Sequence, residues 1–178
     1  GGENNNDDNP QLIQKTICIG SLTGSTLKDS ATNNTFIGHS NAKVVTTGKN
    51  NTFIGNESGS IINIEDENTF IGSYSGYSTL TLSKDIKQHH RNIFIGYRAG
   101  EVITNNISNQ DSIFIGNSSG IGSSGEENIF IGHNSGIDCS NGNDTGTSNI
   151  IICNNPTDKK HGIYNHSTII GSKAGIGN

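Results

Sequence analysis

The side chains able to hold a metal ion or carry acid–base chemistry are six histidines, three cysteines and 16 acidic residues. The histidines have no metal-ligand spacing with cysteines or acids, so we expect no metal, no other cofactor and solvent-facing imidazoles. They are His39, His89, His90, His133, His161 and His166. Cys18, Cys139 and Cys153 form no CxxC pair and are expected to be free thiols, with a Cys139–Cys153 disulfide as the alternative.

Catalytic signatures are missing from the sequence as well. It contains no GxSxG, HExxH or P-loop motif. An enzyme that cleaves polysaccharides on a β-helix would need acids and bases converging on one stripe, whereas the acids here lie mainly in predicted loops and near the start of the chain. We therefore predict that the protein is not an enzyme.

The composition restricts the architecture and the partners. Of the 178 residues 29% are apolar and 24 are glycine, and the net charge is -5. So few apolar residues fill only a thin core. No basic patch predicts nucleic-acid binding, and the longest apolar run, residues 150–153, is far below the roughly 20 residues that span a membrane. We expect a flexible segment at 1–14, a repeat domain at 15–178, and a fragment of a longer chain.

A five-residue motif ending in glycine recurs along the chain. Residues 51–55 read Asn-Thr-Phe-Ile-Gly, and residues 68–72 repeat them without change. The position of this first glycine is occupied by Gly20, Gly38, Gly55, Gly72, Gly96, Gly116, Gly132, Cys153 and Gly171. A second glycine follows four residues later in most copies. Self-similarity at a fixed period is the signature of a repeat architecture.

The length of the repeat decides the fold class. Successive first positions are 16 to 24 residues apart, so the unit has about 17 residues with insertions in one part of the coil. Two-helix repeats need more than about 30 residues, and the β-branched and aromatic motif favours a short strand before a glycine corner. The sequence predicts an all-β fold, a parallel β-solenoid of about nine coils.

The pattern Asn-Thr-Phe-Ile-Gly-x-x-Ser-Gly at residues 51–59 resembles the left-handed parallel β-roll of YadA-like heads in trimeric adhesins. It is also similar to repeats of phage tail fibres and other surface fibres. The resemblance covers residues 16–175, although the coils here are longer. It implies a homotrimer, an extracellular, cell-surface or virion-surface location, and an adhesive role.

The alternation of strand residues suggests which side chains face inward. Side chains on either side of the central motif residue share one face, which we assign to the interior; it carries mostly isoleucine and threonine. The central column then points outward and must be covered, since a long exposed apolar stripe is rare in a monomer. We predict a parallel homotrimer with this column at its axis: Phe36, Phe53, Phe70, Phe94, Phe114 and Phe130, continued by Cys18, Ile151 and Ile169.

Three further columns have expected roles. Small residues three positions after the first glycine should close the interior: Ser58, Ser75, Ala99, Ser119, Ser135 and Ala174. The asparagines that open the motif should form a hydrogen-bonded stack rather than an array of ligands. Five positions before the first glycine are Glu67, Arg91, Asp111 and Glu127, which predict an exposed ladder of ion pairs, with an acidic cation site as the alternative.

The longest insertion, residues 79–91, is the expected ligand-binding region, because insertions in solenoids collect on one face. Its basic residues, with aromatic residues of the adjoining turns, suit a host-surface glycan or a protein receptor. The candidates are Tyr74, Tyr77, Lys84, Lys87, His89, His90, Arg91, Tyr97 and Arg98. The alternatives are a shaft without a ligand and a monomeric protein-binding solenoid. Ice binding uses outward-facing threonines and is disfavoured, because Thr35, Thr52, Thr69 and Thr168 are predicted to point inward.

Overall fold

The computed structural model describes residues 15–28, 30–43, 45, 47–60, 66–78, 89–101, 109–137, 146–154 and 165–172. The predicted flexible segment 1–14 lies outside these residues. The described part contains strands and turns and no helix. Its strands are β1 (Ile17–Ile19), β2 (Thr35–Ile37), β3 (Thr52–Ile54), β4 (Thr69–Ile71), β5 (Ile93–Ile95), β6 (Asn109–Gln110), β7 (Ile113–Ile115), β8 (Gly125–Glu126), β9 (Ile129–Ile131), β10 (Ile150–Ile152) and β11 (Thr168–Ile170).

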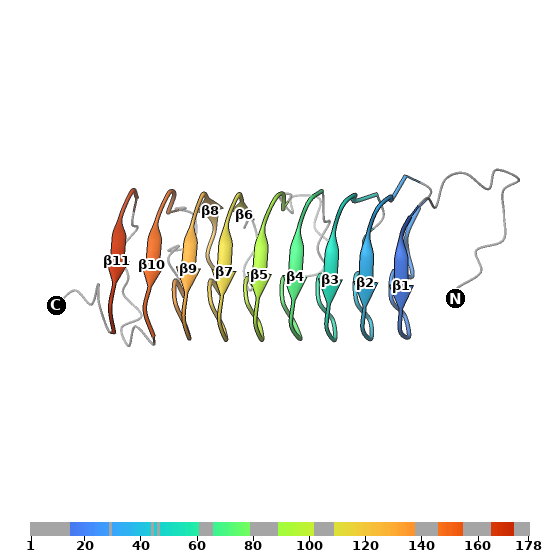
Figure 1. Ribbon diagram of the computed structural model, residues 1–178, viewed down its shortest axis with the longest axis horizontal. Coiled ribbons are helices and arrows are strands. Elements are labelled where there is room, and N and C mark those ends of the chain that lie inside the picture. The colour runs from blue at the N-terminus through green and yellow to red at the C-terminus, as the bar shows by residue number, and fades with distance from the viewer. Residues whose placement is uncertain are drawn as a thin grey trace, which may run out of the picture.

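The strands form a parallel β-solenoid, as the repeat predicts. One nine-stranded parallel sheet runs in the order β1-β2-β3-β4-β5-β7-β9-β10-β11, and β6 pairs with β8 in a small second sheet. Figure 1 shows the strands of the large sheet standing side by side along the long axis, from β1 near the N-terminus to β11 near the C-terminus.

The register of the large sheet is constant. Phe36 pairs with Phe53, and Phe53 pairs with Phe70. The segment between β4 and β5 is longer than the one between β3 and β4, yet Phe70 still pairs with Phe94. Insertions therefore change the connecting segments and leave the strand pairing unchanged.

The phenylalanines fill the interior of the coils, so the predicted orientation of the strands was wrong. All six phenylalanine side chains are at most 1% exposed, whereas isoleucines that flank them face outward, with Ile93 38% and Ile115 36% exposed. The rings stack on one another, with 4.7–5.1 Å between centroids. Side chains do alternate between the two faces of each strand as predicted, but the interior lies on the face that was expected to point outward. In the six coils that carry phenylalanine, one large ring fills the thin core and buries more apolar area than a β-branched side chain would.

The second glycine of each repeat explains this orientation. A Cβ atom built on Gly100 would lie 2.3 Å from a ring carbon of Phe94, and one on Gly120 would lie 2.4 Å from the ring of Phe114. These glycines also adopt φ near +66°. Glycine is therefore favoured opposite the rings, both for its backbone conformation and for the space that the ring occupies, and only Phe36 has an alanine, Ala42, in its place.

The small residues three positions after the first glycine close the interior, as predicted. Ser58, Ser75, Ala99, Ser119 and Ser135 have no exposed surface. The hydroxyls of Ser75 and Ser119 donate hydrogen bonds of 3.0 Å to the carbonyls of Phe94 and Phe130 in the next coil. Ala174 lies outside the described residues.

Candidate functional site

The predicted ligand-binding residues do not form one cluster, because β5 separates them into two groups. His89, His90 and Arg91 precede the strand, and Tyr97 and Arg98 follow it. Tyr74 and Tyr77 lie with the second group, in the corner after β4. Lys84 and Lys87 lie outside the described residues.

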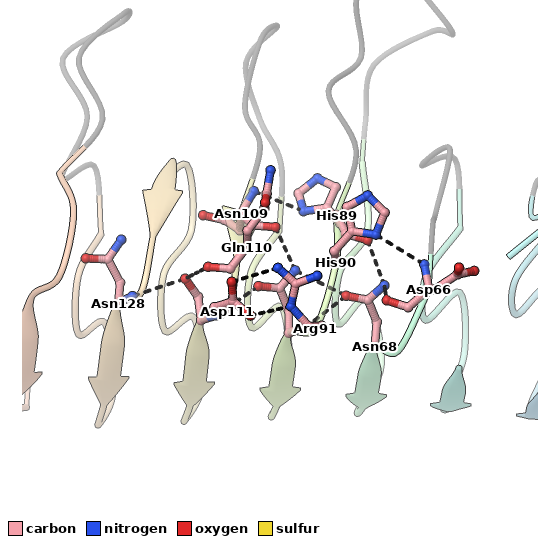
Figure 2. Close-up of polar contacts among 11 residues, drawn as sticks. Asp66, Asn68, His89, His90, Arg91, Asn109, Gln110, Asp111 and Asn128 are labelled. Carbon is pink, nitrogen blue, oxygen red and sulfur yellow. Dashed lines mark hydrogen bonds and ion pairs between the residues drawn. The ribbon is translucent and has the colours of Figure 1, made fainter. Parts of the chain in front are cut away.

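In the first group, Arg91 forms a bidentate ion pair with the adjacent coil (Figure 2). Its Nε and Nη2 atoms lie 2.6 and 2.9 Å from the two carboxylate oxygens of Asp111. These hydrogen bonds hold the pKa of Asp111 below its usual value. The pair confirms the predicted register of this column. Because an arginine stands among the acids, the column fits an exposed ladder of ion pairs better than a cation site.

The asparagine column forms the predicted stack. Oδ1 of Asn51 accepts hydrogen bonds from the backbone N–H and the side-chain amide of Asn68, at 2.9 and 3.2 Å. Asn68 in turn accepts from Asn92, and the Asn68 amide also donates to the carbonyl of His89 at 2.8 Å. Ser112 continues the stack between Asn92 and Asn128. Buried and hydrogen-bonded in this way, the amides stabilise the stack rather than bind a ligand.

His89 is fully buried, which corrects the prediction that all histidines face solvent. His39, His133 and His166 are exposed, His90 is partly buried, and His161 lies outside the described residues. The Nδ1 atom of His89 accepts a hydrogen bond from the backbone N–H of Asn109 at 3.4 Å (Figure 2). Within the described part of the chain, Nε2 of His89 and Oδ1 of Asn109 have no hydrogen-bond partner. Burial lowers the pKa of His89 to about 4, and the neighbouring His90 adds to this effect.

This buried imidazole predicts a loss of stability in mild acid. The unfolded chain takes up the His89 proton near pH 6.5, whereas the folded chain takes it up only near pH 4. The stability is therefore fully present above pH 6.5, falls by up to about 3 kcal/mol as the pH decreases toward 4, and falls no further from this group below that pH. Urea denaturation of the chain between pH 7 and pH 4 measures this loss.

The matched variants for this measurement are His89→Asn and His133→Asn. The next coil carries Asn109 at the position equivalent to His89, so asparagine suits this corner. His89→Asn should flatten the pH dependence, and His133→Asn, at an exposed site, should leave it unchanged. A pH dependence that is identical in His89→Asn and the unmodified chain would contradict the assignment.

The outward side of the large sheet carries two columns of apolar or hydroxyl side chains and no charged residue; we call it the isoleucine face. One column consists of isoleucine throughout, and the other of isoleucine and threonine. Its members are Ile19, Ile37, Ile54, Ile71, Ile95, Ile115, Ile131, Ile152 and Ile170, and Ile17, Thr35, Thr52, Thr69, Ile93, Ile113, Ile129, Ile150 and Thr168. The threonines that were predicted to point inward therefore point outward.

The predicted interface along the central column is wrong, because these side chains lie inside the coil. Phe36, Phe53, Phe70, Phe94, Phe114 and Phe130 offer at most 1% of their surface to another molecule. Ile151 is 5% exposed and Ile169 is partly buried against the core, while Cys18, in the terminal coil, is exposed. The repeated spacing of six residues between phenylalanine and the second glycine, present for five of the six phenylalanines, was the signal in the sequence that could have indicated the correct face.

The corner after β4 and β5 holds a cluster that we call the tyrosine patch: Tyr74, Tyr77 and Tyr97. The ring of Tyr74 lies edge-on to both others, with centroid distances of 5.1 Å to Tyr77 and 6.1 Å to Tyr97. Beside it, the guanidinium of Arg98 forms an ion pair with the nearly buried carboxylate of Glu101.

Other classes of site receive no support from the described residues. In this part of the chain no three His, Cys, Asp or Glu side chains lie close enough together to hold a metal ion, and no helix could cross a membrane. Cys18 and Cys153 are free thiols, while Cys139 lies outside the described residues. No protein-family model, curated protein or solved structure matches the chain.

Proposed function

We propose that the chain is a structural and adhesive segment of a fibre or surface head, in which a rigid solenoid presents its loops and corners to a receptor, glycan or host surface. The observation that carries this proposal is the uncharged isoleucine face, which follows the whole large sheet. The in-register stacking of strands, rings and asparagines supports the role of a rigid spacer. Such a segment belongs outside the cell, on a cell surface or on a virion.

In this proposal the isoleucine face takes the place of the phenylalanine column at the axis of a parallel homotrimer of left-handed coils, about nine in each chain. The nine strands are separated by eight spacings of about 4.8 Å, and each three-residue strand is about 10 Å long, so the face measures about 400 Å². Three such faces would together bury about 1,200 Å², shared among the three contacts of the trimer, a total equal to the lower limit for one stable two-partner interface. A closed trimer would also present each loop three times, which strengthens weak contacts by avidity.

The oligomeric mass of the purified chain tests the assembly. Light scattering at micromolar concentration should give three times the mass of one chain. Ile115→Asp places a charge in the isoleucine face, so it should lower the mass to that of a monomer while the chain stays folded. Asn117→Asp, two residues away on an exposed corner, has the same charge change and should leave the trimer intact. A stable monomer formed by the unmodified chain would contradict the proposed assembly.

A second candidate function is binding to ice, favoured by the outward orientation of Thr35, Thr52 and Thr69. These threonines occupy adjacent, in-register strands beside Ile37, Ile54 and Ile71, in ranks about 4.8 Å apart. A monomeric chain with this face open to water would shape growing ice crystals and show thermal hysteresis. A trimer without thermal hysteresis would exclude this alternative.

A further inference from the structure

The tyrosine patch is a local departure from the repeat. The residue after the first glycine is serine, histidine or asparagine in most coils, but it is Tyr97 in the coil of β5. The corner before it carries Tyr74 and Tyr77. Tyr97 is 49% exposed, and the other two rings are partly exposed. Nothing in the packing of the coil requires tyrosine rings at these positions, because other coils form the same corner without them, as with Asn56, Glu57 and Ser60 in the coil of β3.

The backbone holds these tyrosines firmly in place. Tyr74 adopts φ of +58°, and its N–H donates a hydrogen bond of 2.9 Å to the carbonyl of Asn56 in the preceding coil. The N–H of Arg98, next to Tyr97, donates in the same way to Ser73 at 3.0 Å. A binding surface built on such a corner loses little conformational entropy when a ligand binds.

The charges around the patch disfavour an anionic ligand. The positive charge of Arg98 is compensated by Glu101, whose side chain is nearly buried. The second acid near the patch is Glu57, in the preceding coil. Burial raises the pKa of Tyr77 above its usual value, and the carboxylates of Glu57 and Glu101 add to this rise, so the Tyr77 hydroxyl stays protonated and can donate a hydrogen bond.

Two of the other basic candidates, Arg91 and His89, are also unsuited to an acidic partner at this place. Arg91 is paired with Asp111 at the opposite end of β5, and His89 is buried within the coil. What remains at the patch is apolar ring surface surrounded by hydroxyl, carboxylate and paired guanidinium groups. A neutral sugar has the matching chemistry, because one face of a pyranose ring consists of C–H groups and its edge consists of hydroxyls.

We propose that the tyrosine patch is a binding site for neutral glycans, in which a pyranose ring packs against Tyr97 and Tyr74 while the Tyr77 hydroxyl, Glu57 and Arg98 contact sugar hydroxyls. This inference rests on the adhesive function proposed above, and it identifies the class of ligand and the place where the ligand binds.

Saturation-transfer NMR with the methyl glycosides of glucose, galactose, mannose and N-acetylglucosamine tests the site, with sialyllactose as the anionic probe. At least one neutral glycoside should receive saturation from the protein. Tyr97→Ala and Tyr74→Ala should each weaken its affinity about tenfold, the loss expected for a central aromatic contact. Tyr97→Phe, which keeps the ring, should bind within about threefold of the unmodified chain.

The control is Asn117→Ala, which changes the position equivalent to Tyr97 in the next coil and should leave the affinity unchanged. Circular dichroism confirms that each variant is folded. The proposal is overturned if no neutral glycoside binds, if sialyllactose is preferred, or if Tyr97→Ala binds as tightly as the unmodified chain. Loss of the trimer with binding that still depends on Tyr97 would instead reject the assembly and keep this site.

Discussion

Phe114→Asp should abolish folding, whereas Ile115→Asp, one residue later on the same strand, should leave the chain folded. The Phe114 ring is fully buried between the rings of Phe94 and Phe130, at centroid distances of 4.7 and 4.9 Å. Removing a buried phenylalanine costs about 3–5 kcal/mol, and an unpaired buried carboxylate adds to this cost. Since coils are stabilised by their neighbours, the loss disrupts both adjacent interfaces.

Thermal unfolding followed by circular dichroism measures the difference between these two variants. Phe114→Asp should show no cooperative transition, while Ile115→Asp should retain one. Phe114→Leu fills part of the space with an apolar side chain and should be folded, with an intermediate loss of stability. A folded Phe114→Asp with a normal melting temperature would show that the ring is not part of the interior.

Gly96→Ala should be severely destabilising, more so than Gly100→Ala four residues later. A Cβ atom on Gly96 would lie 2.3 Å from the carbonyl oxygen of Gly116 in the next coil, and the residue has φ of +135°. The backbone of the next coil is held by the hydrogen bonds between coils and has no room to move. We therefore expect the free energy of unfolding to fall by about 3 kcal/mol or more.

The control variant Gly100→Ala puts its Cβ against a side chain instead, the ring of Phe94. One coil already shows how this clash is relieved, because Ala42 replaces the second glycine beside Phe36. The planes of Phe36 and Phe53 differ by 23°, compared with 2–8° between the other stacked rings. The free energy of unfolding, measured by urea denaturation, should therefore fall less for Gly100→Ala, by about 1–2 kcal/mol, and the reverse order of the two variants would contradict this account.

Much of the fold follows from the repeat. The five-residue motif placed the strands, and the columns aligned by the first glycine predicted the pairing of Phe70 with Phe94, the asparagine stack and the contact of Arg91 with Asp111. Each of these depends on residues at a fixed distance from the motif. Strand alternation, by contrast, defines two faces without saying which one is inside. The spacing from phenylalanine to the second glycine distinguishes them, because a Cβ atom at that glycine would clash with the ring as the rings stack in most coils.

The site was less predictable, because its residues lie next to insertions of variable length. His89 and Arg91 are close in sequence to Tyr97, and this proximity predicts a single ligand-binding region. The three-residue strand between them places the two groups at opposite ends of β5. The buried imidazole of His89 accepts a hydrogen bond from the backbone N–H of Asn109 in the next coil. The spacing of residues within one insertion cannot predict such a contact, because it is made with a different coil.

Because the register is constant, the number of residues in a coil does not change how its strand stacks on the next. Gly72 and Gly96 are 24 residues apart and Gly116 and Gly132 only 16, yet the strands that precede them pair residue for residue. A mutation that lengthens or shortens a connecting segment therefore leaves the core intact, so selection for folding removes few such changes. We therefore expect length to vary more readily in these segments than in the motif. A foreign peptide inserted there would be carried in the same way, which makes these segments natural graft positions.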